Sequence, residues 1–598
     1  MYVTTCPSDS VMSGTADVES LFDRFWQWRQ EDSPEFASYC GNHDYDDRWD
    51  DISEEAYLKR ETKVREFLSE AEALDASSCC QVTKDSFALL TEDLTTYLNG
   101  AKFKCYLLPV NFMEGIHNDL VHLIEYHGFD SQEGFTKYLA RLKALPHRIL
   151  QMIPVLKQGI KEGLTMHKHA LAVVPGQMEM MLTEPVEDSL LMAPLLKSGG
   201  PLSTDELDTM KKQVEMELTT NIRPSLEKLK DFIVNEYMHH LRPAEGVCTL
   251  KNGASYYQMC LNFHLSCDMS PQEVHDLGLK EVARIRKQML EISAKEGFGQ
   301  DLKAFQKKLH TSKEFSFDSK DEVMDYVKDI CFNQIRPKLH SVFHTLPDIP
   351  LVLKHTPASQ ANAPAGFYSA GTADKTRPGI YSINANNLDS CKKYEFMALS
   401  LHEGEPGHHL QHSLSVATAV PLFRQYIEDS KYYLAPGRFP MHTAYIEGWG
   451  LYSEALGLEL GMYTDNYSMF GRYSFEMLRA ARLVVDTGLH SMGWTQAKAV
   501  EYLVDSTLTD EWSMRNEVNR YITMPGQACA YKIGELKLWE LRHKAEKELG
   551  DLFDVRDYHA AVLQCGPVPL TFLEGAIDEY ISTTKENQGS PSKKAKAK

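Results

Sequence analysis

The sequence predicts a large, mainly α-helical protein that carries one small antiparallel β-sheet. Amphipathic segments with helix-capping residues recur through the first half of the chain. Strand-like runs rich in β-branched and aromatic residues are confined to residues 351–384. Hydrophobic residues make up 43% of the 598-residue chain and charged residues 25%, which is typical of a globular protein with an ample core. We therefore expect a single helical unit of one or two lobes over residues 17–585, long enough to enclose a deep cleft.

The predicted helices follow one another from the N-terminus to the middle of the chain. Residues 1–16 are expected to form a disordered leader, followed by a helix and a turn-rich connector over residues 18–51. Ser53 has the character of an N-cap for the amphipathic segment that ends near Leu74. Further helices, separated by Gly or Pro breaks, are predicted over residues 132–163, 203–241, 270–297 and 320–340.

Three short runs interrupted by Gly, Pro and Asp predict the sheet, namely Leu351–Lys354, Ala365–Gly371 and Arg377–Asn384. We expect them to pair antiparallel, just before a histidine-rich segment. An exposed edge strand of this sheet could pair with an extended substrate backbone, because its N–H and C=O groups are unpaired. A covered structural hairpin is the alternative.

The charge and the chain ends limit the classes of partner. A formal charge of −21 argues against binding to nucleic acid or to an anionic membrane, since either requires a concentrated basic surface. No apolar run approaches the ~18 residues of a membrane span, and the first residues lack the pattern of a signal peptide. The twelve cysteines show no disulfide framework, so we expect a reduced, cytoplasmic protein. The basic tail over residues 586–598 is expected to be disordered, and solvation explains it better than nuclear import.

The histidine-rich segment between residues 399 and 412 predicts a metal site. It contains four imidazoles and two carboxylates. Neutral imidazoles are the usual ligands of Zn²⁺, and a Glu beside them can take the proton of a water at the metal. The H-E-x-x-H helix that often carries this chemistry is absent here. His402-Glu403 is present, but Pro406 stands four residues beyond His402.

Helix geometry leaves two choices for the second histidine ligand. His409 lies roughly 20° from His402 around an ideal helix but about 10.5 Å further along it, too far to share an ion. His408 points the wrong way on an ideal helix, but Pro406-Gly407 can bulge the turn and absorb two residues. We therefore expect His402 and His408 as ligands and Glu403 as general base. The regularly spaced pair of His408 and His412 remains open.

These residues resemble a known family. The histidine-rich segment, followed by Tyr445-Ile-Glu447-Gly-Trp449-Gly-Leu-Tyr-Ser-Glu454, is similar to the DUF885 family, a group of zinc-peptidase-like proteins placed with the gluzincins. Further similar segments lie at residues 50–53, 269–278 and 525–534. The resemblance covers residues 17–585 and implies a helical metallopeptidase-like fold, a small sheet beside the active-site cleft, one zinc ion and a peptidase mechanism.

The expected third ligand is an acidic residue on a separate helix. Glu447 lies 39 residues beyond His408 and is flanked by Gly448 and Gly450, which permit close helix approach. Both the chemistry and the resemblance indicate Glu447. Glu454 lies on the same helical face and could hydrogen-bond a ligand histidine, or it could be an exposed ion-pairing residue.

A polar stripe on an otherwise apolar helix gives an independent clue. Arg479, Arg482, Asp486 and His490 fall on one face. Buried polar groups need partners, so the stripe should face a polar cavity or form a paired network. Asp486 could orient a zinc-ligand histidine and Arg482 could hold a substrate carboxylate, with a purely structural network as the alternative.

Polar residues on both sides of the predicted helix break at Pro525-Gly526 complete the candidate site. A phenol aimed at the carbonyl oxygen of a scissile amide can stabilise the charge that develops there. Tyr531 is our first candidate for this role and Tyr521 the second. Arg520 and Gln527 are candidates for substrate binding.

Together these patterns predict a zinc hydrolase that cleaves short peptides or amino-acid amides. The sequence lacks the G-x-S-x-G elbow, the Walker loop and a G-x-G-x-x-G after a strand, which argues against the commonest serine-hydrolase, NTPase and dinucleotide-binding classes. A zinc amidase or lyase acting on a non-peptide metabolite is the same-fold alternative. A catalytically silent helical binding or scaffold protein is the alternative from another class.

Overall fold

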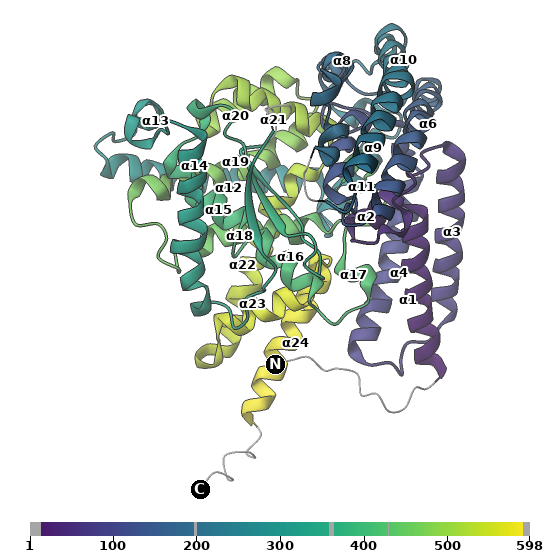
Figure 1. Cartoon of the computed structure of the whole chain (residues 1–598). Coiled ribbons are helices and arrows are strands. Elements are labelled where there is room, and N and C mark those ends of the chain that lie inside the picture. Colours follow the sequence, from purple (N-terminus) through teal and green to yellow (C-terminus); the bar gives the residue numbers. More distant parts are fainter. Residues whose placement is uncertain (1–12, 197–199, 358–363, 429, 590–598) are drawn as a thin grey trace. The chain divides into compact units, whose positions relative to one another are not determined.

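The computed structural model describes residues 13–196, 200–357, 364–428 and 430–589. The chain divides into two compact units. The first unit is formed by Met1–Met259, Ala419–Met441 and Ile522–Met524, and the second by Cys260–Thr418, His442–Tyr521 and Pro525–Lys598. Helices dominate both units (Figure 1). The mainly α-helical fold class predicted from the sequence is therefore confirmed.

The first unit contains helices with recognisable terminal signals. The Oγ of Ser53 accepts a hydrogen bond from the N–H of Ala56, as expected for an N-cap. Gly163 ends the longest helix of this unit, and the glycine itself adopts the left-handed backbone conformation, with φ +72°. The helices of this unit are α1 (Ser13–Asp32), α2 (Pro34–Tyr39), α3 (Glu54–Ala73), α4 (Gln81–Ala101), α5 (Ile116–Tyr126), α6 (Gln132–Glu162), α7 (Lys168–Leu171), α8 (Val174–Thr183), α9 (Thr204–Glu217), α10 (Arg223–Asn235) and α17 (Leu422–Gln425).

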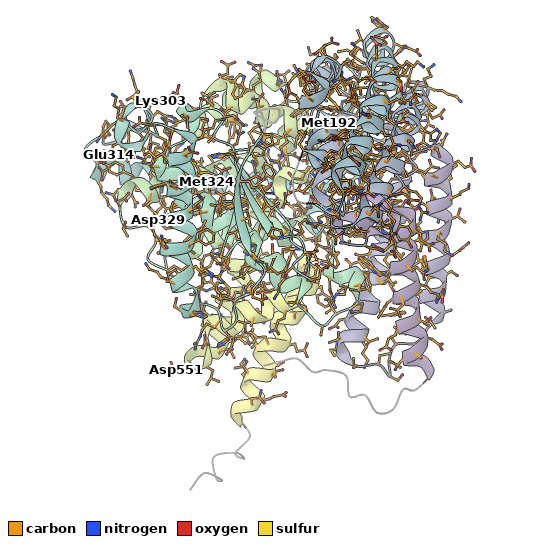
Figure 2. The ribbon with its side chains drawn as sticks, viewed as in Figure 1. Met192, Lys303, Glu314, Met324, Asp329 and Asp551 are labelled. Atoms are coloured by element: carbon orange, nitrogen blue, oxygen red, sulfur yellow. The ribbon has the colours of Figure 1, made fainter. Side chains whose placement is uncertain are left out.

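The second unit is built on two pairs of long helices, in which α12 packs along α19 and α18 along α22. Charged side chains such as those of Lys303, Glu314 and Asp551 lie on its outside (Figure 2). Its helices are α12 (Pro271–Lys295), α13 (Leu302–Thr311), α14 (Lys320–Lys328), α15 (Lys393–Glu403), α16 (His408–Val416), α18 (Thr443–Leu456), α19 (Asn466–His490), α20 (Gln496–Thr507), α22 (Ala530–Leu549), α23 (Val555–Gln564) and α24 (Leu570–Gly589). Two more helices, α11 (Gly253–Leu265) and α21 (Glu511–Thr523), have residues in both units.

The small sheet is mixed, and our expectation of a purely antiparallel sheet was wrong. Its strands β1 (Leu351–His355), β2 (Gly366–Ser369) and β3 (Gly379–Ile383) lie in the order β1-β3-β2. The short connection between β2 and β3 lets them pair antiparallel, with Tyr368 opposite Tyr381. Because β1 is not the sequence neighbour of β3, it can lie on the far side of β3 and run parallel to it. The sheet packs against α14 and α15.

Two of the predicted helices are interrupted. The segments 203–241 and 320–340 each contain a π-helical turn, at Leu218–Ile222 and Asp329–Ile335. Each turn lies just before a proline, Pro224 or Pro337. A proline inside a helix has no N–H to donate and its ring displaces the preceding carbonyls, so the backbone widens there.

The expected ends of the folded region are off by a few residues. Helix α1 begins at Ser13, within the predicted leader, and α24 continues to Gly589, within the predicted tail. The remainder of both segments lies outside the described residues. In the described part of the chain, none of the helices combines the length and the apolar character that crossing a membrane requires.

Candidate metal centre

A break between two helices forms the base of the candidate centre. Helix α15 ends at Glu403 and α16 begins at His408, so the intervening Pro-Gly segment separates two helices instead of bulging one. A Cβ on Gly407 would lie 1.8 Å from the carbonyl oxygen of His402, so this close approach requires glycine. The break lets the chain bring His408 back beside His402, and the centroids of their rings lie 4.7 Å apart.

Glu447 comes to both histidines from α18. Its Oε2 lies 3.5 Å from Nε2 of His402 and 3.4 Å from Nε2 of His408. A Cβ on Gly450 would lie 2.7 Å from the imidazole of His402, so the absence of a side chain at this position allows α18 to pack close to His402. The structure therefore brings together the three residues that were predicted as metal ligands.

The donor atoms of this trio fit a tetrahedral zinc ion. Ligands about 2.0–2.1 Å from zinc lie roughly 3.3 Å from one another, close to the two distances above. Oε2 of Glu447 is buried and has no hydrogen-bond partner among the described residues, as expected of an atom reserved for a cation. Burial alone would raise the pKa of Glu447, but His402 and His408 hold it well below its usual range.

Glu454 fixes the orientation of His402. Its Oε1 lies 2.8 Å from Nδ1 of His402, so Nδ1–H donates to the carboxylate and Nε2 faces Glu447. The Glu454 side chain is 1% exposed, so the alternative of an exposed ion pair is wrong. Burial would lower the pKa of His402, but Glu447 and Glu454 raise it to about 9.

The other two histidines of the segment connect α16 to the sheet region. Nε2 of His409 lies 3.1 Å from the carbonyl oxygen of Ile349, and its Nδ1 lies 3.2 Å from the hydroxyl of Tyr368. Nε2 of His412 lies 3.0 Å from the carbonyl oxygen of Gly371. The rival ligand pair of His408 and His412 is therefore not supported, since a structural hydrogen bond uses Nε2 of His412.

Glu403, the predicted general base, is the last residue of α15. It is 7% exposed, and its carboxylate lies close enough to His402 and Tyr381 to raise the pKa of both. Its carboxylate is therefore close to one of the three metal-ligand candidates, His402. The structure is thus compatible with its predicted role.

Tyr531 lies between the histidines and a group of arginines. Its ring is stacked on that of His402 at 6.5 Å with an interplanar angle of 22°. The guanidinium carbons of Arg479, Arg482 and Arg520 lie 5.9, 4.7 and 5.9 Å from the centroid of the same ring, and we call these three residues the arginine cluster. The Tyr531 hydroxyl accepts hydrogen bonds from Arg520 at 3.0 Å and from Gln527 at 3.4 Å.

Glu517 is the member of this network that we did not predict. Its Oε2 accepts hydrogen bonds from Nη2 of Arg482 at 2.9 Å and from the Tyr521 hydroxyl at 2.6 Å. Burial would raise its pKa, but Arg482 and Arg520 lower it to about 2. Its position four residues before Tyr521 places both on one helical face, a spacing that could have revealed it. The Tyr521 hydroxyl already donates its hydrogen bond to Glu517, so it is not an available oxyanion donor.

Asp486 does not orient a ligand histidine, and that prediction was wrong. Its Oδ1 accepts a hydrogen bond from the N–H of Gly526 at 3.0 Å. The chain turn at Gly526 brings an N–H group to the side chain, and Glu454 occupies Nδ1 of His402. Asp486 therefore holds the turn that precedes Gln527 and α22.

Two other groups of three candidate donors occur within the described ranges, and their surroundings suit a cation less well. They are His167 with His169 and Glu245, and His344 with Asp554 and Asp557. Burial and the nearby His169 and Arg242 lower the pKa of His167 to about 4, and the fixed positive charge of Arg242 beside the group disfavours a cation there. Asp554 is neutralised by Arg556 at 2.5 Å.

Comparison with known proteins gives one family and similar solved structures. Residues 34–577 match the family described as "Bacterial protein of unknown function (DUF885)". A crystal structure of a candidate lipoprotein from Colwellia psychrerythraea is 25% identical, with a TM-score of 0.89 over 96% of this chain and 100% of that one. A candidate lipoprotein of unknown function from Shewanella oneidensis is 17% identical, with a TM-score of 0.67 over 94% and 99% of the two chains. None of the curated proteins matched.

Proposed function

The chain belongs to the DUF885 family, whose description assigns no activity, and we propose that it is a zinc-dependent hydrolase of peptide or amide bonds. Its substrates would be short peptides or amino-acid amides. The observation that carries the proposal is the convergence of His402, His408 and Glu447 on one point, with the buried Oε2 of Glu447 lacking a hydrogen-bond partner among the residues described. Two histidines and one glutamate are a ligand set of catalytic zinc sites, which keep a position open for water.

The residues of this chain would divide the reaction between them. A zinc ion held by His402, His408 and Glu447 would supply Lewis-acid chemistry and make a nearby water acidic enough to attack at neutral pH. Glu403 accepts the proton of that water and returns it to the amine that leaves. Glu454 holds His402 in the tautomer that ligation requires.

Tyr531 is placed to stabilise the negative charge on the carbonyl oxygen. Its oxygen receives hydrogen bonds from Arg520 and Gln527, which fix the phenol and leave its own proton to be donated. A hydroxyl already accepting from a guanidinium is a stronger donor, because successive hydrogen bonds polarise one another. This supports Tyr531 over Tyr521 as the oxyanion donor.

The proposal predicts that Glu403→Gln keeps zinc but loses hydrolysis by about 10²- to 10⁴-fold, the usual range for loss of a general base. His402→Ala should lose the metal as well. The measurements are zinc content by mass spectrometry and cleavage of a short-peptide library. Undiminished cleavage by Glu403→Gln would refute the mechanism. Zinc retained in full by His402→Ala would place the metal elsewhere, with the His167, His169 and Glu245 group as the first site to examine.

A further inference from the structure

The arginine cluster contains one buried donor that lacks an acceptor among the described residues, on Arg479. Arg479 is 6% exposed and Arg482 is 5% exposed, and arginine does not lose its proton in proteins. Nη1 of Arg479 donates to the carbonyl oxygen of Phe475 at 3.3 Å, and its Nη2 lies 3.7 Å from Oε1 of Glu454, an oxygen that already accepts from His402. Nε of Arg479 is buried without a hydrogen-bond partner in the described part of the structure. A buried donor left in this state is costly, so an additional acceptor is expected nearby.

The cluster lies beside the reaction centre. The ring of Tyr531 is close to both the guanidinium of Arg482 and the imidazole of His402. The Arg482 guanidinium lies 4.7 Å from the Tyr531 ring centroid and that centroid lies 6.5 Å from the His402 ring, so the cluster and His402 are at most about 11 Å apart, roughly three residues of extended peptide at ~3.3–3.6 Å each. A group bound at the cluster would therefore sit within about three residues of the bond that is cleaved.

The chemistry of the cluster selects an anion. Guanidinium presents a planar fork of donors that matches a carboxylate through two parallel hydrogen bonds. Gln527 supplies a side-chain amide at the same place, bonded to Arg520 and Tyr531. A substrate ammonium group would meet three guanidiniums, and Oε2 of Glu517, a carboxylate oxygen beside the cluster, already accepts from Arg482 and Tyr521.

We propose that the arginine cluster binds a carboxylate of the substrate, which makes this protein selective for peptides or N-acyl amino acids with a free C-terminal carboxylate close to the scissile bond. The proposal rests on the hydrolase function above. It assigns Arg482 to binding and leaves proton transfer to Glu403.

Two libraries of tripeptides test this substrate class. Both have the same sequences, but one has free C-terminal carboxylates and the other C-terminal amides. Zinc-loaded wild-type protein is expected to cleave the carboxylate library at least tenfold faster, as read by mass spectrometry of the products. Equal cleavage, or preference for the amides, would overturn the proposal and leave the hydrolase function standing.

A variant pair assigns the preference to the cluster. Arg482→Lys keeps the charge but removes guanidinium donors from the cluster, and it should raise KM for carboxylate peptides about 10- to 100-fold and so remove most of the preference for carboxylates over amides. Arg472→Lys is the matched control, since Arg472 is a buried arginine on the same helix that pairs with Glu476, and it should change neither rate. If Arg482→Lys does not fold, Arg479→Lys takes its place. An unchanged preference in the folded variant contradicts the assignment.

A binding measurement separates failure of this proposal from failure of the hydrolase function. If neither library is cleaved, the hydrolase function is wrong for peptides. The Tm of Glu403→Gln protein is then compared in the presence of each library, because a ligand that binds the folded state raises Tm. A rise with carboxylates alone supports the carboxylate site. Equal shifts, or none, overturn it.

Discussion

At the scale of single residues, Glu454 is as important to the proposed zinc site as the three metal-ligand candidates. A zinc-ligand histidine needs its second ring nitrogen hydrogen-bonded, so that the lone pair of the first is fixed in direction. Glu454 provides this for His402 at 2.8 Å from a fully enclosed position. It also lies 3.7 Å from Arg479, which connects the metal centre to the arginine cluster.

We expect Glu454→Gln to lower zinc affinity about 10- to 100-fold without unfolding the protein. The amide can still accept from Nδ1–H, but the negative charge that makes the imidazole a better ligand is lost. Competition with a chelator of known affinity measures the effect. Glu459→Gln is the control, because Glu459 lies near the end of the same segment and pairs with Arg542 away from the histidines. Unchanged zinc affinity in Glu454→Gln would show that His402 is not oriented in this way.

At the scale of elements, the break between α15 and α16 creates the centre. Gly407 touches the carbonyl oxygen of His402 so closely that no side chain fits. His409 and His412 then tie α16 to the sheet region through three hydrogen bonds. The position of His408 is therefore set by the sheet region as well as by its own helix.

Gly407→Ala should abolish zinc binding and lower the thermal stability of the second unit. The added Cβ meets rigid backbone, so α16 must move and carry His408 away from Glu447. Gly575→Ala is the matched control. Nothing lies within 4 Å of the Cβ that would be added there inside α24, so this change should be neutral or stabilise by up to about 1 kcal/mol. Full zinc occupancy in Gly407→Ala would contradict the proposed geometry.

The helices and strands also show which parts of the fold could be predicted from the sequence. Helices with clear caps, such as the one that Ser53 begins, could be predicted because capping is local. The parallel pairing of β1 with β3 could not, since it depends on a connection between strands that are not neighbours in the sequence. The same distinction holds at the site. The spacing indicated His402, His408 and Glu447, whereas it could not indicate that Asp486 accepts a hydrogen bond from a backbone N–H brought in by a distant turn.

At the scale of the whole molecule, the candidate chemistry belongs to one of the two units. The metal-ligand candidates, Glu403, Tyr531 and the arginine cluster all fall in the second unit, on helices α15, α16, α18, α19, α21 and α22. The chain carries a net charge of −21, yet three guanidiniums gather beside the metal-ligand candidates. Net charge over the whole chain bears on solubility, whereas the proposed substrate preference depends on this local cluster.

The most direct test of the account is X-ray diffraction from crystals of the zinc-loaded protein, collected on both sides of the zinc absorption edge. We predict one strong anomalous peak about 2.0–2.2 Å from Nε2 of His402, Nε2 of His408 and a carboxylate oxygen of Glu447. A zinc peak found elsewhere, or none at this position in fully loaded crystals, would contradict the central claim.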